Sequence, residues 1–373
     1  MFTGLTSHEA GVPYNNMPIR EELRDKELGN VFKASEEYEC VYAGKWHLPR
    51  VTITEGHGFT KIADWGDIGL AERSIEFLER KHEKPFFLVV SFINPHDICQ
   101  WARNQTLPWG PIPPEPPTEE CPDLPANFAI PPFEPEVLRM EMEANPKVYP
   151  SVGFPDEHWR RYRNAYFRLC EKVDAQIGQI LDAMRSNGLE DDTLVIFTSD
   201  HGDGHGHHRW NQKTALYDEV TRCPFIVSWK GVTKAGHVDR DHLVSNGLDL
   251  MPTLCDYAGI DAPPGLSGRS LRPLVEGGDV DEWHDQLVAE TWFGPKVGYG
   301  TQGRMVRTQR YKYMCYDWGQ YREQLFAMDE DPGEMANLAV NTAHTDALND
   351  HRRRLAAWCK ETNDKKFDVP GEG

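Results

Sequence analysis

The length, composition and charge of the chain fit a globular protein and exclude several classes. The chain has 373 residues, of which 39% are hydrophobic and 11% aromatic, and its formal net charge at pH 7 is −19. This length accommodates one large α/β domain with an appendage, or two domains. The negative charge argues against general affinity for nucleic acids or anionic membranes, and no apolar run approaches the length of a membrane-spanning helix.

The first predicted elements are two strands and one helix. The run YECVYAG at 38–44 predicts a short strand, and the loop GKWHLPR follows it. Residues 67–82 have apolar side chains at helical spacing between charges, beginning with Ile68. The continuous apolar run KPFFLVVSF at 84–92 is typical of a strand in a sheet that is buried on both faces. It ends in INPHD.

A proline-rich excursion follows at about 106–150. It holds 13 of the chain's 27 prolines, all between Pro108 and Pro150. This density predicts a long surface segment without regular helix or sheet. Such a segment could shape a substrate cleft, or it could be a surface insertion without a role in binding.

The remaining elements predict an α/β core followed by a smaller unit. A strong helix is expected over 156–188, buried strands over 193–200 and 223–229, and a helix over 247–259. Helices that alternate with buried strands predict a parallel sheet with helices on both faces. After about residue 284, short half-alternating strands and a last helix predict a small antiparallel α+β subdomain. The predicted domains are 1–283 and 284–373.

The run TSDHGDGHGHH, which begins at Thr198, carries four of the chain's 15 histidines directly behind a predicted strand. In an open parallel sheet, ligands bind outside the carboxyl ends of the strands, where Asp200 and His201 are expected. A carboxylate beside an imidazole in a glycine-rich turn suits a divalent cation. The carboxylate favours Ca²⁺ or Mg²⁺ and the imidazole favours zinc or manganese, so the pair does not identify the metal. A polar loop that is merely rich in histidine is the alternative.

Two further strand ends carry residues of related chemistry. His96 follows one predicted strand in INPHD, and Lys45 and His47 follow another in GKWHL. If these strands are neighbours, Lys45, Lys213 and several histidines meet at one edge of the sheet. They would suit an oxyanion such as sulfate or phosphate, by neutralising its charge and giving a proton to a leaving oxygen. Each residue taken singly is more simply a surface lysine or a hydrogen-bonded histidine.

Five motifs occur in the order used by the sulfatase family, within the alkaline phosphatase superfamily, and the chain resembles that family over nearly its whole length. These motifs are GKWHL at 44–48, NPH at 94–96, TSDHGDGHGHHRWNQK at 198–213, YDEVTRCPFIV at 217–227 and LFAMDEDPGEMANLA at 325–339. The resemblance implies an alkaline-phosphatase-like, mostly parallel sheet sandwiched by helices, with a small C-terminal α+β subdomain. It also implies a sulfuric ester hydrolase that acts on a sulfated carbohydrate or another alcohol or aryl sulfate.

The same resemblance assigns roles to residues around the sulfate group. Lys45 and His47 match the pair that flanks the nucleophile and the sulfate, and His96 matches a histidine that contacts the sulfate and protonates the leaving alcohol. Lys213 matches the lysine that holds sulfate oxygens. His208 matches a histidine on the substrate side, or one directly behind the substrate contacts.

The resemblance also implies a metal. Asp200 and His201 match two ligands of a single divalent cation, most often Ca²⁺, with Zn²⁺ or Mn²⁺ less expected. His205 and His207 match no role and are expected to be solvated loop residues. The implied partner is a small-molecule or oligosaccharide sulfate ester, and the implied location is periplasmic or extracellular. Oligomeric state stays open.

One expected motif of the family does not occur in the sequence. The family's nucleophile is a formylglycine made within C/S-x-P-x-R, and none of the cysteines or serines has proline at +2 with arginine at +4. The opening MFTGLTSHEAGV resembles the stretch that follows this motif, so the first strand, paired metal-binding carboxylates and the nucleophile are expected upstream of Met1. A late start codon, a truncation or split gene, and a degenerate descendant are the possible causes. The retained site residues favour the first two.

Two alternative functions stay open on the sequence. One is a phosphodiesterase or phosphonate hydrolase of the same superfamily that uses zinc or manganese. The other is a non-catalytic protein that binds sulfated glycans. In the expected sulfuric ester hydrolase, Trp101, Trp109 and Trp210 could line a sugar subsite by stacking, although tryptophans at a surface need no such role.

Overall fold

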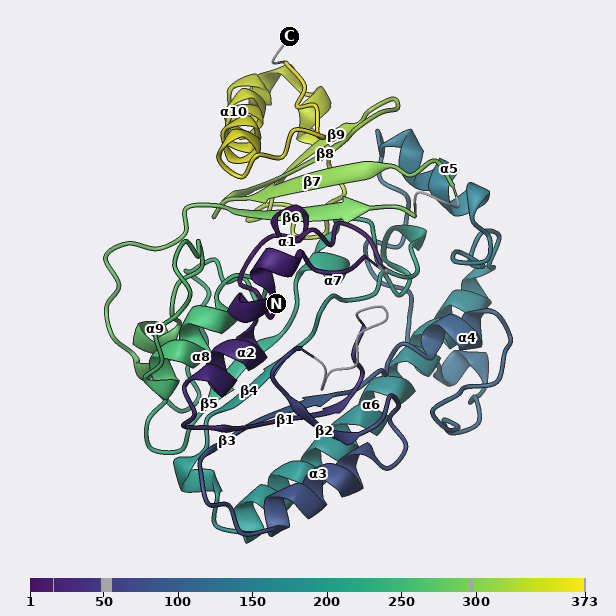
Figure 1. Cartoon of the computed structure of the whole chain (residues 1–373). Coiled ribbons are helices and arrows are strands. Elements are labelled where there is room, and N and C mark those ends of the chain that lie inside the picture. The colour runs from purple at the N-terminus through teal and green to yellow at the C-terminus, as the bar shows by residue number, and fades with distance from the viewer. Residues whose placement is uncertain (16, 48–55, 295–297, 372–373) are drawn as a thin grey trace.

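A computed structural model describes residues 1–15, 17–47, 56–294 and 298–371 (Figure 1). The part of the predicted loop GKWHLPR that lies beyond His47 is outside the described residues. The described strands form three sheets with the orders β2-β1-β3, β4-β5 and β6-β7-β8-β9. Among the described residues, no helix is long and apolar enough to cross a membrane.

The first sheet is parallel and lies between two layers of helices. Its strands are β1 (Glu39–Gly44), β2 (Thr60–Ala63) and β3 (Phe86–Ser91), and its helices are α2 (Leu28–Ala34), α3 (Leu70–Glu79), α6 (Asp156–Ser186) and α8 (Leu250–Ala258). Successive residues of β1 face opposite layers, because side chains alternate along a strand. Tyr42 packs in a cluster with α2 and α8, whereas Val41 packs in a cluster with α3 and α6. The expected sheet between helices is therefore confirmed (Figure 1).

The second sheet departs from the expected single parallel sheet. Strands β4 (Val195–Thr198) and β5 (Phe225–Ser228) pair antiparallel with each other, and β4 is not paired with β3. Both were expected to be buried on both faces, yet Phe197 is 40% and Ile226 56% exposed. The antiparallel direction of β5 corrects the prediction, and the exposure of β4 follows from an edge without a described neighbour.

The third sheet is antiparallel, as expected for the C-terminal part of the chain. Its strands are β6 (Leu287–Trp292), β7 (Gln302–Arg307), β8 (Tyr311–Tyr316) and β9 (Glu323–Ala327). Helix α10 (Thr345–Glu361) covers one face, and the other shares a core with α5 (Glu136–Ala144) and with the buried Trp210 (Figure 1). A domain boundary near residue 284 stays a prediction.

Two helix predictions need correction. Helix α3 begins at Leu70, after Gly69 in the left-handed region, and Ile68 is 74% exposed instead of lying on its apolar face. The proline-rich excursion contains α5, because the stretch from Glu136 to Ala144 carries no proline and follows Pro135, which can precede a helix. The remaining α-helices are short: α1 (Ser7–Ala10), α4 (Ile98–Ala102), α7 (Asp218–Thr221) and α9 (Arg272–Glu276).

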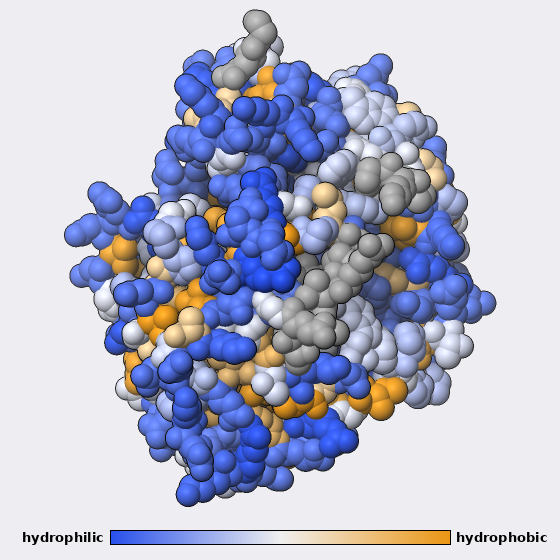
Figure 2. Space-filling view, in the orientation of Figure 1, coloured by the Kyte–Doolittle hydropathy of each residue, from blue (hydrophilic) through white to orange (hydrophobic). Residues whose placement is uncertain are grey.

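The face seen in Figure 2 is mainly hydrophilic, in keeping with the net charge of −19. Apolar residues gather there in small patches at the level of α2 and α8 and of the parallel sheet.

Candidate functional site

The carboxyl end of β1 places Lys45 beside the end of β3. The Lys45 N–H donates to the Ser91 carbonyl at 2.8 Å, and the Tyr42 hydroxyl donates to the Lys45 carbonyl at 2.6 Å. Gly44 makes this close approach possible, because its φ is +94° and a Cβ atom there would overlap the Ser91 carbonyl. The Lys45 side chain is 15% exposed and reaches the end of β4.

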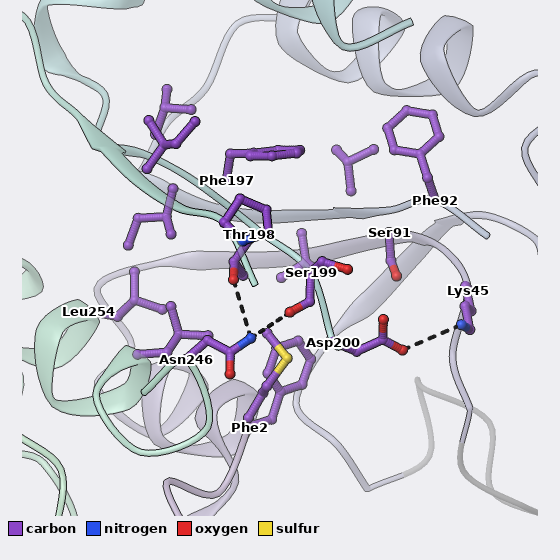
Figure 3. Close-up of a pocket in the computed structure, with 18 of the residues that line it drawn as sticks. Phe2, Lys45, Ser91, Phe92, Phe197, Thr198, Ser199, Asp200, Asn246 and Leu254 are labelled. Carbon is purple, nitrogen blue, oxygen red and sulfur yellow. Dashed lines mark hydrogen bonds and ion pairs between the residues drawn. The ribbon is translucent and has the colours of Figure 1, made fainter. Parts of the chain in front are cut away.

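The end of β4 supplies Asp200 and His201. The Asp200 Oδ2 atom lies 3.7 Å from the Lys45 ammonium nitrogen (Figure 3) and 3.6 Å from His201 Nε2. The His201 Nδ1–H donates to the Gly202 carbonyl at 2.7 Å, which leaves Nε2 as an acceptor. Lys213 donates to that Nε2 atom at 3.0 Å. The structure therefore brings together Lys45, Asp200, His201 and Lys213, as the sequence predicted.

A strained loop holds Lys213 in this place. Residues with positive φ are concentrated in it, namely His205, His208, Arg209, Gln212 and Thr214. Asp203 organises the loop, because its carboxylate accepts from the N–H groups of His205 and Gln212 and from the Tyr162 hydroxyl. Burial raises the pKa of Asp203 to about 6. Strain of this kind persists only where the surrounding structure enforces it, which is common at functional sites.

His96 lies in the loop after β3 and lines the same cavity as the cluster. The buried Asp67 carboxylate holds this loop by accepting from the N–H groups of Ile93 and Asn94, at 2.6 and 3.0 Å. Neither Asp67 nor Asp203 was predicted from the sequence. Asp203 could have been suspected from its place inside the motif, whereas nothing in the sequence near Asp67 marks its role.

The electrostatics of the site favour an anion. Burial, with the charges of Lys45 and Lys213, lowers the pKa of His96 to about 4, and the same causes lower the pKa of His47. These histidines are therefore neutral at pH 7. The pKa of Asp200 is also lowered, because His201, Lys45 and Lys213 outweigh the opposing effect of burial. The ammonium groups of Lys45 and Lys213 lie at the same end of the sheet, where both can contact one anion.

His47 lies at the open side of the site, next to a tryptophan that the sequence analysis did not name. The rings of His47 and Trp65 are 5.8 Å apart and nearly perpendicular, and Trp65 is 47% exposed. The suggestion that Trp210 lines a sugar subsite is wrong, because this side chain is 1% exposed and belongs to a core cluster. Trp109 lies against Gly66, the neighbour of Trp65.

The structure does not bring His208 to the cluster. His208 is fully buried and stacks on Tyr217 with ring centroids 3.8 Å apart. The expectation that His205 and His207 are solvated is wrong. His205 stacks on Tyr166 and its Nδ1 atom accepts from the Arg163 guanidinium at 3.0 Å, and His207 pairs with Glu219 at 2.8 Å.

The residues at the site fit a divalent cation in part. Asp200 Oδ2 and His201 Nε2 are 3.6 Å apart, so both can be neighbouring ligands of one ion. However, Lys213 donates to the same Nε2 atom, and one carboxylate with one imidazole falls short of the six to eight oxygen donors that Ca²⁺ takes. Further donors are needed for tight binding of a hard cation.

Two other groups of potential ligands already contain a cation. His208, Glu219 and Glu334 lie together, but the buried Lys312 ammonium is 2.8 Å from Glu334. His8, Glu290 and Asp364 lie together as well, and the Arg304 guanidinium is 2.8 Å from Asp364 and 3.7 Å from Glu290. In each group a cationic side chain already lies within ion-pair distance of a carboxylate, so we assign no metal to either group.

Fold and site together define an α/β protein with a cationic, metal-compatible site at the carboxyl ends of its strands. The family described as sulfatase matches residues 1–260, and the family described as N-sulphoglucosamine sulphohydrolase, C-terminal, matches residues 206–361. The chain therefore belongs to the sulfatase family, and its fold is of the alkaline-phosphatase type.

Relatives agree with this assignment. The chain is 30% identical to a Delta 4,5-hexuronate-2-O-sulfatase of Bacteroides thetaiotaomicron, over 98% of this chain and 78% of that protein. It is 30% identical to a choline-sulfatase of Rhizobium meliloti, over 73% of this chain and 50% of that protein. The solved structure of a 2-O GAG sulfatase superposes with a TM-score of 0.84 at 28% identity, covering 99% of this chain and 82% of that one. The alternatives of a phosphodiesterase or a non-catalytic protein are not favoured.

Proposed function

We propose that Lys45 and Lys213 bind the sulfate group of a saccharide sulfate ester at the end of the parallel sheet. The observation that carries this proposal is the position of two ammonium groups in one cavity, Lys45 at 3.7 Å from Asp200 and Lys213 at 3.0 Å from His201 Nε2. A sulfate monoester is an anion whose non-bridging oxygens both lysines can contact. The sulfatase family membership gives the reaction class, which is hydrolysis of a sulfuric ester.

The histidines serve proton transfer in this proposal. His96 and His47 are neutral at pH 7 because burial and the two lysines lower their pKa values. A bound sulfate offsets the lysine charges and so raises the pKa of His96 toward the range useful for protonating a leaving oxygen. No nucleophile is assigned among these residues.

A divalent cation completes the proposed site, with Asp200 and His201 as two of its ligands. The cation would act as a Lewis acid that stabilises charge on the sulfate oxygens. We propose Ca²⁺ on the carboxylate ligand and the family resemblance, with Zn²⁺ and Mn²⁺ as the competing ions. The proposed location is periplasmic or extracellular.

The saccharide part of the proposal rests on Trp65 and on the named relatives. A half-exposed indole beside His47 offers a flat apolar face to a sugar ring next to the sulfate. The relative from Bacteroides thetaiotaomicron is named for hexuronate 2-O-sulfate, so a 2-O-sulfated unsaturated uronic acid disaccharide is the substrate to try first.

Calorimetric titration with that disaccharide and its unsulfated counterpart tests the proposal, in CaCl₂ and in EDTA, with sulfate release followed by ion chromatography. We expect binding of the sulfated sugar only, and weaker binding in EDTA. Equal binding of both sugars would show that the sulfate is not the recognised group. Binding without sulfate release supports recognition by this chain and contradicts turnover by it.

A further inference from the structure

A buried pair of ionisable side chains lies behind the strand end that carries Lys45. The carboxylate of Glu27, the residue before α2, accepts from the Nδ1–H group of His57 at 2.6 Å, and the two side chains are 3% and 2% exposed. The fold, and not local spacing, brings these residues together, because they are 30 positions apart. Burying such groups costs free energy unless they are paired and hydrogen-bonded. Neither residue has a role in the proposed sulfate site.

The His57 ring contacts the residue between the two site residues at the end of β1. The ring centroids of His57 and Trp46 are 4.8 Å apart, with an interplanar angle of 57°. Trp46 also packs edge-on against Tyr42, whose hydroxyl donates to the Lys45 carbonyl at 2.6 Å. Lys45, Trp46 and His47 all line the cavity of the proposed sulfate site. Because Trp46 is bonded to both neighbours, the place of its indole ring fixes where the backbone carries Lys45 and His47.

The backbone of His57 is itself fixed by helix α2. Asn30 Nδ2 donates to the Gly56 carbonyl at 2.7 Å. Gly29 lies so close to this segment that a Cβ atom there would be 2.2 Å from the His57 carbonyl oxygen. Helix α2 therefore holds the main chain of His57, and the orientation of the imidazole ring is left to its side-chain contacts.

The bond to Glu27 is the single polar contact of the His57 ring among the described residues. Within the same residues, His57 Nε2, Glu27 Oε1 and Trp46 Nε1 are buried without a hydrogen-bond partner. A carboxylate can only accept, so it fixes the proton on His57 Nδ1 and with it the plane of the ring. Removal of this one acceptor would free the ring that supports Trp46.

We propose that Glu27 is a positioning residue of the sulfate site, which acts through His57 and Trp46 on the strand end that carries Lys45 and His47. Its carboxylate orients the imidazole, the imidazole supports the indole, and the indole holds the main chain between the lysine and the histidine. Glu27 itself is assigned no contact with the sulfate. The inference rests on the proposed function, because Lys45 and His47 are the residues that it positions.

Two variants separate positioning from a purely electrostatic role. Glu27→Leu removes both the charge and the acceptor, whereas Glu27→Gln removes the charge and keeps an oxygen that accepts from the Nδ1–H group. Removal of a negative charge alone would strengthen the binding of an anion. Positioning predicts the opposite for leucine. By calorimetry, we expect the 2-O-sulfated disaccharide to bind about 3- to 30-fold more weakly to Glu27→Leu, and within about twofold of the wild type to Glu27→Gln.

A double-mutant cycle tests whether Glu27 acts through His57. His57→Leu should weaken binding as Glu27→Leu does, and adding Glu27→Leu to it should change the affinity by less than about twofold. Two leucines replace a buried ionic pair with apolar groups, a replacement that is often neutral for stability. His351→Leu is the matched control, because His351 is a buried histidine whose hydrogen bonds are to Thr308 and Ala347 in the C-terminal part of the chain.

Hydrogen exchange at the Lys45 amide gives a readout that needs no ligand. This N–H group donates to the Ser91 carbonyl at 2.8 Å, and in Glu27→Leu it should exchange at least about fivefold faster than in the wild type, with amides of β7 and β8 unchanged. Equal affinities of the leucine and glutamine variants, additive effects in the cycle, an equal loss in the control or unchanged exchange at Lys45 would each overturn the positioning role. A wild type that binds the sulfated and unsulfated sugars equally contradicts the proposed function instead. The exchange measurement then still decides whether Glu27 holds the strand end.

Discussion

Replacing Lys213 with methionine tests the proposed sulfate site most directly. The substitution keeps most of the side-chain volume and removes one of two ammonium groups that face Asp200. In the wild type, the Lys213 ammonium donates to His201 Nε2 at 3.0 Å and lies in the cavity that also contains His96. The variant therefore removes a positive charge without opening a large cavity in the core.

The magnitude follows from the geometry of that ammonium group. A hydrogen bond to a charged group contributes about 1.5–3 kcal/mol, which corresponds to about 10- to 150-fold in affinity. Two unit charges about 4 Å apart interact by about 4 kcal/mol at the effective dielectric of a protein surface, which is an upper bound. We expect Lys213→Met to bind the sulfated disaccharide about 10- to 150-fold more weakly than the wild type.

Calorimetry gives the affinity, and Lys360→Met on the exposed side of α10 is the matched control. An NMR titration adds a local readout, because Lys213 is one of the charges that lower the pKa of His96. The pKa of His96 should rise in Lys213→Met and stay unchanged in the control. A loss of affinity below threefold, or an equal loss in the control, would refute the assignment of Lys213 to the sulfate.

Two further predictions concern stability and are measured by urea unfolding. Gly202→Ala should destabilise the protein by about 1–3 kcal/mol, because the added Cβ atom would overlap the Glu219 carbonyl. Gly178→Ala on α6 should stabilise the protein by about 0.5–1 kcal/mol, because the added Cβ atom meets no other atom and alanine favours a helix over glycine. Burial raises the pKa of Glu334 to about 7, although Lys312 opposes this. The folded state then keeps a proton that the unfolded state releases above pH 4.5. Between pH 5 and pH 7, the free energy of unfolding of the wild type should fall by up to about 3 kcal/mol more than that of Glu334→Gln. Parallel pH curves for the two proteins would contradict this.

The sequence could predict which residues meet at the site because parallel strands end at the same edge of a sheet. Lys45, His96 and Asp200 each follow a strand whose apolar run is easy to recognise. Asp67 and Asp203 could not be assigned in this way, because Asp67 accepts from N–H groups of the loop after β3, and Asp203 accepts from the Tyr162 hydroxyl of α6 and from N–H groups of its own loop. Such contacts depend on loop conformations that no periodic pattern encodes.

The largest difference between expectation and structure lies in β4 and β5. Continuous apolar runs predict strands that are buried on both faces, yet Phe197 and Ile226 are 40% and 56% exposed. The apolar runs indicate side chains suited to burial, and the structure leaves these two partly exposed. Phe197 lies in β4, which pairs with β5 alone among the described strands, and its exposure reflects the open second edge of that strand.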